Sequence, residues 1–330
     1  QRDLELRLSW TESSPVTVHL ASATLATVPR TVPTPADALR EQPLVEVLVV
    51  GHGRRSANVR NTATAVGSRR RHVDHAERID GPWRVIEITQ RDAVTGLTSI
   101  STLRSLEAEG ALESWTEVRN DGDIDLHLQA VSSLMLARPV AETPLSRTDS
   151  IEGTSEWLGE CRWETRPVRD QGGLPRLDLA AHQRQDSRGA ISIVSQGSWS
   201  SGQRVPSGVL ATRSGGPALA WQINHNGAWR VELDERLGEG DTGFLVLGMF
   251  GPTDADHAWS RTLTPGDCFT TVPVAVAGSA DGWPAAIAGM THLRRHLMPA
   301  VRRPAVLFND YMNTLMGDPT TAKLLPLIDA

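Results

Sequence analysis

The chain has 330 residues, a length at which two domains are the ordinary expectation. Its hydrophobic fraction of 39% and charged fraction of 22% are typical of a soluble globular protein. The net charge of -6 argues against nucleic acid or an anionic membrane surface as a partner. No segment approaches the ~18 consecutive apolar residues that a membrane helix needs.

Cys161 and Cys268 are the only two cysteines, and they are widely separated. Their spacing gives no zinc motif, and it leaves a disulfide between them open without supporting one. The first ten residues alternate in charge and lack the apolar stretch of a signal peptide. We therefore expect a cytoplasmic protein, with a leader removed before Gln1 as the open alternative.

Residues 1–277 read as a series of short β-prone runs separated by Gly, Pro, Asp and Asn. Such spacing without helical periodicity predicts a large antiparallel sandwich of two sheets, a supersandwich. The Asp-Gly and Asn-Gly signals in segments 120–123 and 224–227 each predict a hairpin turn. The runs predicted as strands cover residues 4–8, 44–50, 83–88, 114–118, 126–131, 191–194, 218–223, 229–233 and 244–247.

The periodicity changes after Asp281, where apolar residues recur at steps of three and four and predict an amphipathic helix that ends near Pro299. We assign residues 278–303 to a helical linker. Residues 304–308 then form an apolar run that predicts a strand covered on both faces. A helix is expected from Asp318 and Pro319, bent or delayed by Pro326. Segment 304–330 thus reads as the first strand and the start of the first helix of a (β/α)8 barrel, cut inside the domain.

Polar side chains follow the apolar run at once, namely those of Asn309, Asp310, Tyr311 and Asn313. In a (β/α)8 barrel the loops after the strands carry the chemistry. These residues are therefore either loop residues that cap the next helix or part of a functional site.

The other candidate groups have simpler interpretations. The basic run from Arg54 to His75 is predicted to be a solvated face or a subunit contact, because no aromatic residues interleave it. Segment 254–257, Asp-Ala-Asp-His, is predicted to cap a turn rather than bind metal. The carboxylates of Glu87, Asp92, Glu117 and Glu232 are predicted to face solvent from strands. The ten tryptophans are expected mainly in the core, although Trp also stacks on sugars.

The segment from Phe308 to Thr321 resembles the first barrel strand and loop of the α-galactosidases of glycoside hydrolase family 36. Upstream matches occur in the order that this family shows. They are Ser-Trp-Thr-Glu-Val-Arg-Asn at 114–120, Ser-Trp-Ser at 198–200, Trp-Gln-Ile-Asn-His-Asn-Gly at 221–227 and Gly-Pro-Thr-Asp at 251–254.

The resemblance implies a β-sandwich, a helical linker and a barrel that hydrolyses terminal α-galactosides with retention, using two aspartates and no cofactor. Both catalytic aspartates are expected beyond Ala330, so this chain alone should be inactive. Tyr311 falls where many members carry a tryptophan against the galactose, and Asp310, Met312 and Asn313 flank it as further substrate-binding candidates. The family also implies a dimer or tetramer in which the 51–75 region lines a neighbour's site. The alternative is a carbohydrate-binding or oligomerisation module without chemistry.

Overall fold

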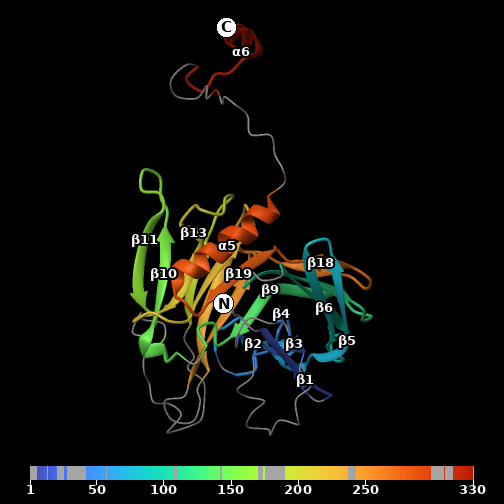
Figure 1. Ribbon diagram of the computed structural model, residues 1–330. Coiled ribbons are helices and arrows are strands. Elements are labelled where there is room, and N and C mark those ends of the chain that lie inside the picture. Colours follow the sequence, from blue (N-terminus) through green and yellow to red (C-terminus); the bar gives the residue numbers. More distant parts are fainter. Residues whose placement is uncertain are drawn as a thin grey trace. The chain divides into compact units, whose positions relative to one another are not determined.

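The computed structural model describes residues 6–12, 14–20, 26–27, 42–56, 58–106, 110–141, 143–169, 174, 190–236, 243–298, 308 and 315–329. The chain divides into two units, residues 1–293 and 294–330, and each is described by itself. Strands dominate the first unit, as the sequence predicts (Figure 1). No helix among the described residues is long and apolar enough to cross a membrane.

One sheet has nine strands, in the order β12-β15-β16-β9-β2-β1-β3, with β17 and β4 also paired to β9. Its pairs are antiparallel except for β1 with β3 and β2 with β9. The bounds are β1 Leu6–Thr11, β2 Ser14–Leu20, β3 Ala26–Thr27, β4 Val47–Val49, β9 Leu126–Ala137, β12 Ile191–Ser195, β15 Trp229–Arg236, β16 Phe244–Phe250 and β17 Arg261–Leu263.

The other sheet has ten strands, in the order β11-β10-β13-β14-β19-β8-β7-β6-β5, with β18 paired to β8. All its pairs are antiparallel, and β5 and β11 are its two edges. The bounds are β5 Arg71–Asp80, β6 Trp83–Arg91, β7 Leu97–Leu106, β8 Ala111–Asn120, β10 Thr148–Thr154, β11 Arg162–Pro167, β13 Arg204–Thr212, β14 Ala218–Ile223, β18 Cys268–Thr270 and β19 Val274–Ser279.

The core lies between the sheets and draws its side chains from both of them. Two of its largest members are Trp221 and Trp229, each fully buried, whose rings meet edge to face at 6.0 Å. Trp221 belongs to the ten-stranded sheet and Trp229 to the nine-stranded one, so this contact joins the two layers. Aromatic pairs of this kind add to the stabilisation that burial alone gives.

The two predicted hairpins are wrong in the same way. β8 and β9 flank the 120–123 turn but belong to different sheets, and so do β14 and β15 around segment 224–227. Asn120 shows how the first crossing is held: its Nδ2 donates to the carbonyls of Ile124 and Leu263, and its Oδ1 accepts from Gly122. An Asp-Gly or Asn-Gly signal reports a tight turn, but it does not report which sheet receives the next strand.

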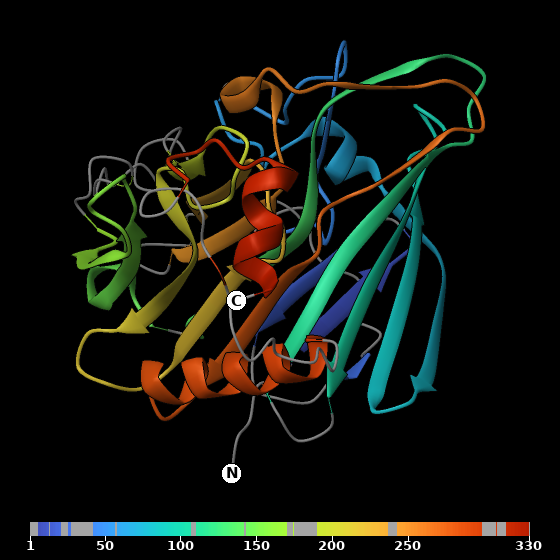
Figure 2. The same ribbon diagram turned by 90° about the horizontal axis from the view of Figure 1, so that it is seen from above.

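Helix α5, Trp283–Leu297, confirms the predicted amphipathic helix. Figures 1 and 2 agree that its first-unit part lies across strands of the ten-stranded sheet, on the face turned away from the core. That face carries small buried side chains on neighbouring strands, which let a helix approach closely: Ala211, Ala218, Ala220, Ala275 and Ala277. The helix buries Ala286, Met290 and Leu293 in turn. Three short helices also lie among the described residues of the first unit: α2 Ala65–Arg69, η1 Leu145–Arg147 and α4 Asp254–His257.

In the second unit, helix α6 spans Thr321–Asp329 and has no buried residue. It begins two residues after Pro319, and the carbonyl of Thr320 accepts from Lys323 and Leu324 at its start. Pro326 lies inside the helix and does not delay its beginning. The strand predicted over 304–308 lies outside the described residues apart from Phe308, whose side chain is 57% exposed.

Candidate functional site

The four predicted substrate-binding residues, Asp310, Tyr311, Met312 and Asn313, lie outside the described residues. Their role therefore stays a prediction. The described residues do contain two other constellations that sequence reasoning missed. One is a buried charged network on β15, and the other is a set of aromatic side chains on the outer face of the ten-stranded sheet.

The charged network consists of four alternate residues of β15, Arg230, Glu232, Asp234 and Arg236. Alternate residues of a strand share a face, and the intervening Val231 and Leu233 belong to the core. The four charged residues therefore face away from the core, yet each is at most 7% exposed. Arg230 and Glu232 pair at 2.6 Å between Nη2 and Oε2, and Arg236 and Asp234 pair at 2.9 Å between Nη1 and Oδ2.

A segment far away in the sequence covers this network. Glu232 Oε1 accepts from the backbone N–H of Asn61 at 2.9 Å and of Thr62 at 3.3 Å. Arg236 Nη2 donates to the carbonyl of Thr62 at 2.6 Å, and Asp234 accepts from the Thr62 hydroxyl. The network therefore fixes the 58–64 loop onto β15.

Burial raises the pKa of Glu232, and it also raises the pKa of Glu46, whose Oε2 accepts from the backbone N–H of Thr64. A raised carboxyl pKa is one mark of a catalytic acid. Glu232 is nevertheless fully buried and bonded to Arg230 and the 58–64 loop, so a substrate cannot reach it. Glu232 therefore holds the 58–64 loop in place and is not a catalytic acid.

This burial corrects two sequence predictions. Glu232 and Asp92 do not face solvent: both are fully buried, and Asp92 accepts from Arg69 Nη2 at 2.9 Å and from the Thr95 hydroxyl at 2.9 Å. Glu87, by contrast, is about one-third exposed and pairs with Arg78 across the strands. A charged residue on a strand looks solvated in sequence, and nothing local reveals a loop that folds over it.

The basic run from Arg54 to His75 is not a solvated face throughout. Arg60 and Arg70 are fully buried, and burial lowers the pKa of Arg70 to about 10. Arg60 Nη1 donates to the carbonyl of Glu235, and Arg70 Nη1 donates to Ser99 Oγ at 2.5 Å. These two arginines therefore bond segments of the sandwich to each other from inside, and they do not form a docking surface.

Segment 254–257 forms the short helix α4, as its turn signals suggest. Asp256 pairs with Arg230 at 2.6 Å, and His257 Nδ1 accepts from the backbone N–H of Thr253. Burial lowers the pKa of His257. Over the described ranges, no group of three or more His, Cys, Asp or Glu side chains is arranged to hold a metal ion. Cys161 and Cys268 are both free and exposed.

Tryptophans on the outer face of the ten-stranded sheet occupy two different settings. On β6, β7 and β8 the Arg104 guanidinium lies 4.6 Å from the Trp83 ring and 5.3 Å from the Trp115 ring. Glu113 accepts from Arg104 Nε at 2.8 Å and from Asn224 Nδ2 at 2.9 Å. The guanidinium thus occupies the space between these two rings through cation–π contacts.

On β10 and β11 the aromatic surface is open. Trp163 lies opposite Gly153 and is 49% exposed. A Cβ at Gly153 would stand 2.6 Å from Val205 Cγ2, too close for an unshifted side chain, and at an ordinary contact distance of 3.4 Å from Trp163 Cδ2, so glycine at this position leaves room for Val205. Trp157 and Leu158, in the turn between the two strands, are more than 80% exposed. The expectation of mainly buried tryptophans therefore fails here.

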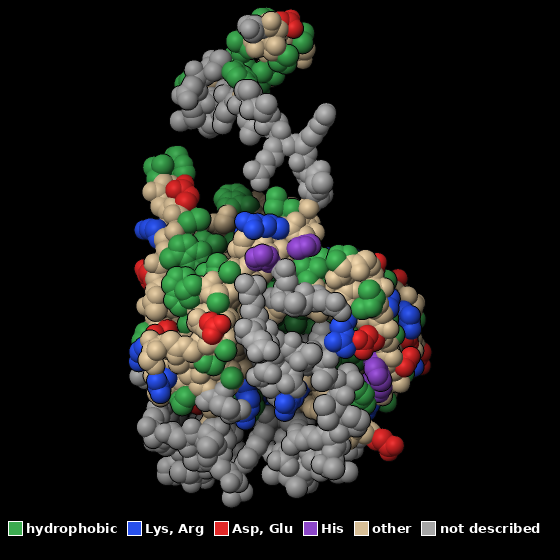
Figure 3. All heavy atoms as spheres, viewed as in Figure 1, with side chains coloured by type: hydrophobic (Ala, Val, Ile, Leu, Met, Phe, Trp, Pro, Cys, Tyr) green, Lys and Arg blue, Asp and Glu red, His purple; other side chains and the backbone are tan. Residues whose placement is uncertain are grey.

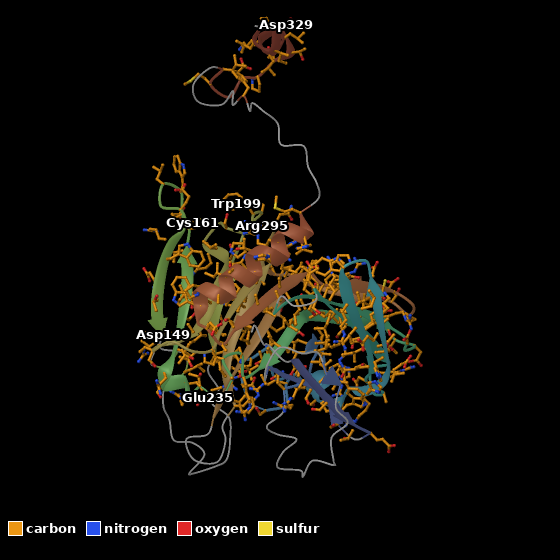
Figure 4. All side chains as sticks on the ribbon, viewed as in Figure 1. Asp149, Cys161, Trp199, Glu235, Arg295 and Asp329 are labelled. Atoms are coloured by element: carbon orange, nitrogen blue, oxygen red, sulfur yellow. The ribbon has the colours of Figure 1, made fainter. Side chains whose placement is uncertain are left out.

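Figure 3 shows this difference on the surface, with hydrophobic side chains gathered at the tip of the β10–β11 hairpin and on the face below it. In Figure 4, Cys161 lies at the start of β11, near the turn of the same hairpin, and Asp149 lies near its base. Trp199, on the loop between β12 and β13, is 63% exposed. The backbone N–H of Ser155 donates to the carbonyl of Gln203, which ties the hairpin to the loop that carries Trp199.

Comparison with known proteins gives matches among solved structures alone: no family model and no curated protein sequence matches the chain. The α-galactosidase AgaB of Geobacillus stearothermophilus, from glycoside hydrolase family 36, aligns with a TM-score of 0.61 at 16% identity over 84% of this chain and 39% of its own. The same organism's AgaA in complex with raffinose gives 0.64 at 16% identity, over 87% and 41%. The α-galactosidase of Lactobacillus brevis gives 0.60 at 13% identity, over 87% and 41%.

The chain thus spans about two-fifths of the length of these solved structures. At such low identity the likeness concerns the fold. The described residues have the β-sandwich fold found in part of the family 36 α-galactosidases, in agreement with the motifs that suggested this family.

Proposed function

We propose that the chain is the N-terminal part of a retaining α-galactosidase, an enzyme that hydrolyses terminal α-galactosides. The observation that carries this proposal is the structural match to family 36 α-galactosidases over 84–87% of the chain. The order of the sequence motifs supports the same family. The sandwich and α5 would then serve as scaffold and linker for a barrel that begins at residues 304–330.

Retaining hydrolysis needs two carboxyl groups about 5–5.5 Å apart, one as nucleophile and one as acid and base. Among the described residues, the buried carboxylates of Glu46, Asp92, Glu232 and Asp234 are already bonded within the sandwich. We therefore propose that later barrel strands, beyond Ala330, supply both catalytic aspartates. This mechanism requires no metal or organic cofactor.

The proposal is tested with 4-nitrophenyl α-galactoside and the protein that contains this chain together with its barrel. Release of nitrophenol is expected from the α-galactoside, and little from the matching β-galactoside or α-glucoside. The 330-residue chain alone should release none. A folded full-length protein that leaves the α-galactoside intact would refute the assignment.

Within the barrel segment, we propose that Tyr311 packs against the galactose, with Asp310, Met312 and Asn313 beside it. Loss of the ring in Tyr311→Ala should lower kcat/KM on small α-galactosides about two- to tenfold or more, because an aromatic contact contributes about 0.5–1.5 kcal/mol in addition to the burial of its area. Met316→Ala is a suitable control, since Met316 is 78% exposed. Equal kinetics for the two variants would remove Tyr311 from the site.

A second candidate function is sugar binding without chemistry, and the exposed rings of Trp157 and Trp199 favour it. Tryptophan stacks on the apolar face of a sugar ring. Calorimetric titration of the 330-residue chain with raffinose tests this role. Binding that Trp199→Ala abolishes would support a binding module, whereas the absence of heat at millimolar sugar would reject it.

We further propose that the parent enzyme is a cytoplasmic homo-oligomer, a dimer or a tetramer. If the 51–75 region lines a neighbour's active site, its loop must be held firmly while its tip stays accessible. The bonds from Glu232 and Arg236 to Asn61 and Thr62 supply the anchor, and Val59 at the tip is 71% exposed.

A further inference from the structure

No strand among the described residues pairs with the outer edge of β11, and the pairing of β11 on its other side is regular. All six of its residues are exposed, and its pairing with β10 runs without a register shift from Asp149↔Pro167 to Thr154↔Arg162. Figure 1 shows β11 at the border of the ten-stranded sheet. An edge of this kind presents unpaired backbone groups that can receive another strand.

The direction of these backbone groups follows from one hydrogen bond. The N–H of Val168 donates to the carbonyl of Thr148 on β10 at 2.9 Å. Backbone groups of successive residues in a strand point to opposite sides, so the even-numbered residues of β11 face β10. The N–H and C=O groups of Trp163 and Thr165 therefore point outward, toward an incoming strand.

The charges of β11 then favour a second copy of β11 as the incoming strand, in one particular register. Arg162, Glu164 and Arg166 alternate along one face. If a second β11 pairs antiparallel about a two-fold axis at Trp163, each Arg162 lies opposite the Glu164 of the other copy. An axis at Glu164 would instead place Glu164 against Glu164 and Arg162 against Arg166, which like-charge repulsion disfavours. An axis at Thr165 would place the outward N–H of Trp163 against Pro167, which has no N–H to return.

Glu164 has the capacity for this extra partner. Both of its hydrogen bonds from Arg166 reach the same oxygen, Oε2, and no other described residue donates to Oε1. A carboxylate accepts at both oxygens, so Oε1 can take an Arg162 guanidinium from another copy. The pairing would also cover Trp163, whose ring is half exposed on the outer face.

From this geometry we infer that two copies of the chain associate through antiparallel pairing of their β11 edges, with the two-fold axis at Trp163. Each interface then contains two Arg162–Glu164 pairs and two facing tryptophans. This interaction is isologous, since the same surface serves both copies. It is independent of the enzymatic proposal, because it involves only the sandwich.

A charge exchange at β11 tests the inference by sedimentation equilibrium of the 330-residue chain. Glu164→Arg alone brings like charges together and should weaken the dimer about tenfold or more. Arg162→Glu alone should do the same. The double variant Arg162→Glu, Glu164→Arg restores opposite charges in every pair and should return the dimerisation constant to near its original value. A merely structural effect would not be rescued in this way.

Cross-linking tests the position of the axis. Trp163→Cys in a Cys161→Ser, Cys268→Ser background should form an intermolecular disulfide, because Cα atoms of a hydrogen-bonded antiparallel pair lie about 5.5 Å apart. Thr165→Cys in the same background is the matched control, since residue 161 of the other copy would face it. A chain that is monomeric at all concentrations, a double variant that stays dissociated, or equal cross-linking of both cysteine variants would overturn the inference.

Discussion

The two edge strands of the ten-stranded sheet, β5 and β11, differ in how readily their unpaired backbone groups can accept another strand. At β5 the pairing with β6 shifts register between His72 and Asp74, and such a bulge bends and twists an edge away from regular pairing. Trp10 also stacks on His72, with ring centroids 4.6 Å apart. At β11 the register is unbroken. The irregular pairing of β5 therefore hinders addition of another strand at that edge, whereas the regular pairing of β11 leaves its edge suitable for a partner strand.

The charges of the two edges differ in the same sense. On β5, Glu77 pairs with Arg84 and Arg78 pairs with Glu87, both on the neighbouring strand β6. These charged side chains of β5 thus form their ion pairs within the sheet. On β11, Arg166 and Glu164 pair with each other along the strand, and Arg162 has no ion pair among the described residues. An edge strand whose charged side chains are paired within the sheet has fewer of them available for ion pairs with a second chain.

The largest expected effect comes from a carboxylate placed at the proposed axis. Trp163→Glu should abolish self-association at micromolar concentrations, because two like charges would then lie directly opposite each other. Val73→Glu is the matched change on β5, where Val73 is 58% exposed. Sedimentation velocity should show a monomer for the first variant and an unchanged dimer for the second; the reverse result would exchange the roles of the two edges.

A smaller effect is expected from pH, which should change the stability at the β5 edge but leave pairing at the β11 edge unchanged. Burial and the nearby His75 lower the pKa of His72 below its ordinary 6.5. The folded state therefore holds this proton less readily than the unfolded chain, and the stability that neutral His72 contributes is lost as the pH falls below 6.5. Arg166 lowers the pKa of Glu164, so the charges of β11 persist through this window.

Melting temperatures between pH 7 and pH 5 measure this difference. They should fall less steeply for His72→Gln than for the original chain, while the dimerisation constant stays level in both. Parallel melting curves for the two proteins would show that His72 does not contribute to the acid sensitivity of this edge.

The smallest effect is expected from the cross-strand charges of β5. Glu77→Ala removes the partner of Arg84, and a pair this exposed contributes about 1 kcal/mol or less to the free energy of unfolding. Urea denaturation should detect a slight loss, and added salt should reduce the difference. A loss well above 1 kcal/mol would mean that β5 depends on its charges rather than on its bulge.

Sequence reasoning found elements whose signals are local. The strands β6, β14 and β15 and the helix α5 lie where their periodicity placed them, because alternation and amphipathic spacing depend only on nearby residues. The two sheet crossings were missed, since their turns resemble hairpin turns until the partner sheet is known. Burial of Glu232 was missed for the same reason, because the loop that covers it lies 170 residues away.

The candidate site residues also fall into two groups, those recognisable from local sequence and those that depend on the tertiary structure. The motif around Tyr311 could be read from the sequence, because a resemblance needs only the order of residues. The cation–π contacts of Arg104 and the open edge of β11 could not be read, since both depend on which strands become neighbours. The alternating Arg and Glu of β11 are visible in sequence, but they gain meaning only when the strand is known to be an edge.

The anchoring of Asn61 by Glu232 also constrains how the protein is made. The two residues are 171 positions apart, and the earlier one leaves the ribosome long before the later one is synthesised. Until β15 is synthesised, the backbone N–H groups of Asn61 and Thr62 lack the carboxylate of Glu232 that they bind in the folded protein. We therefore expect an early nascent chain to expose this loop to proteases and chaperones, and its protection to appear abruptly once residue 236 has emerged.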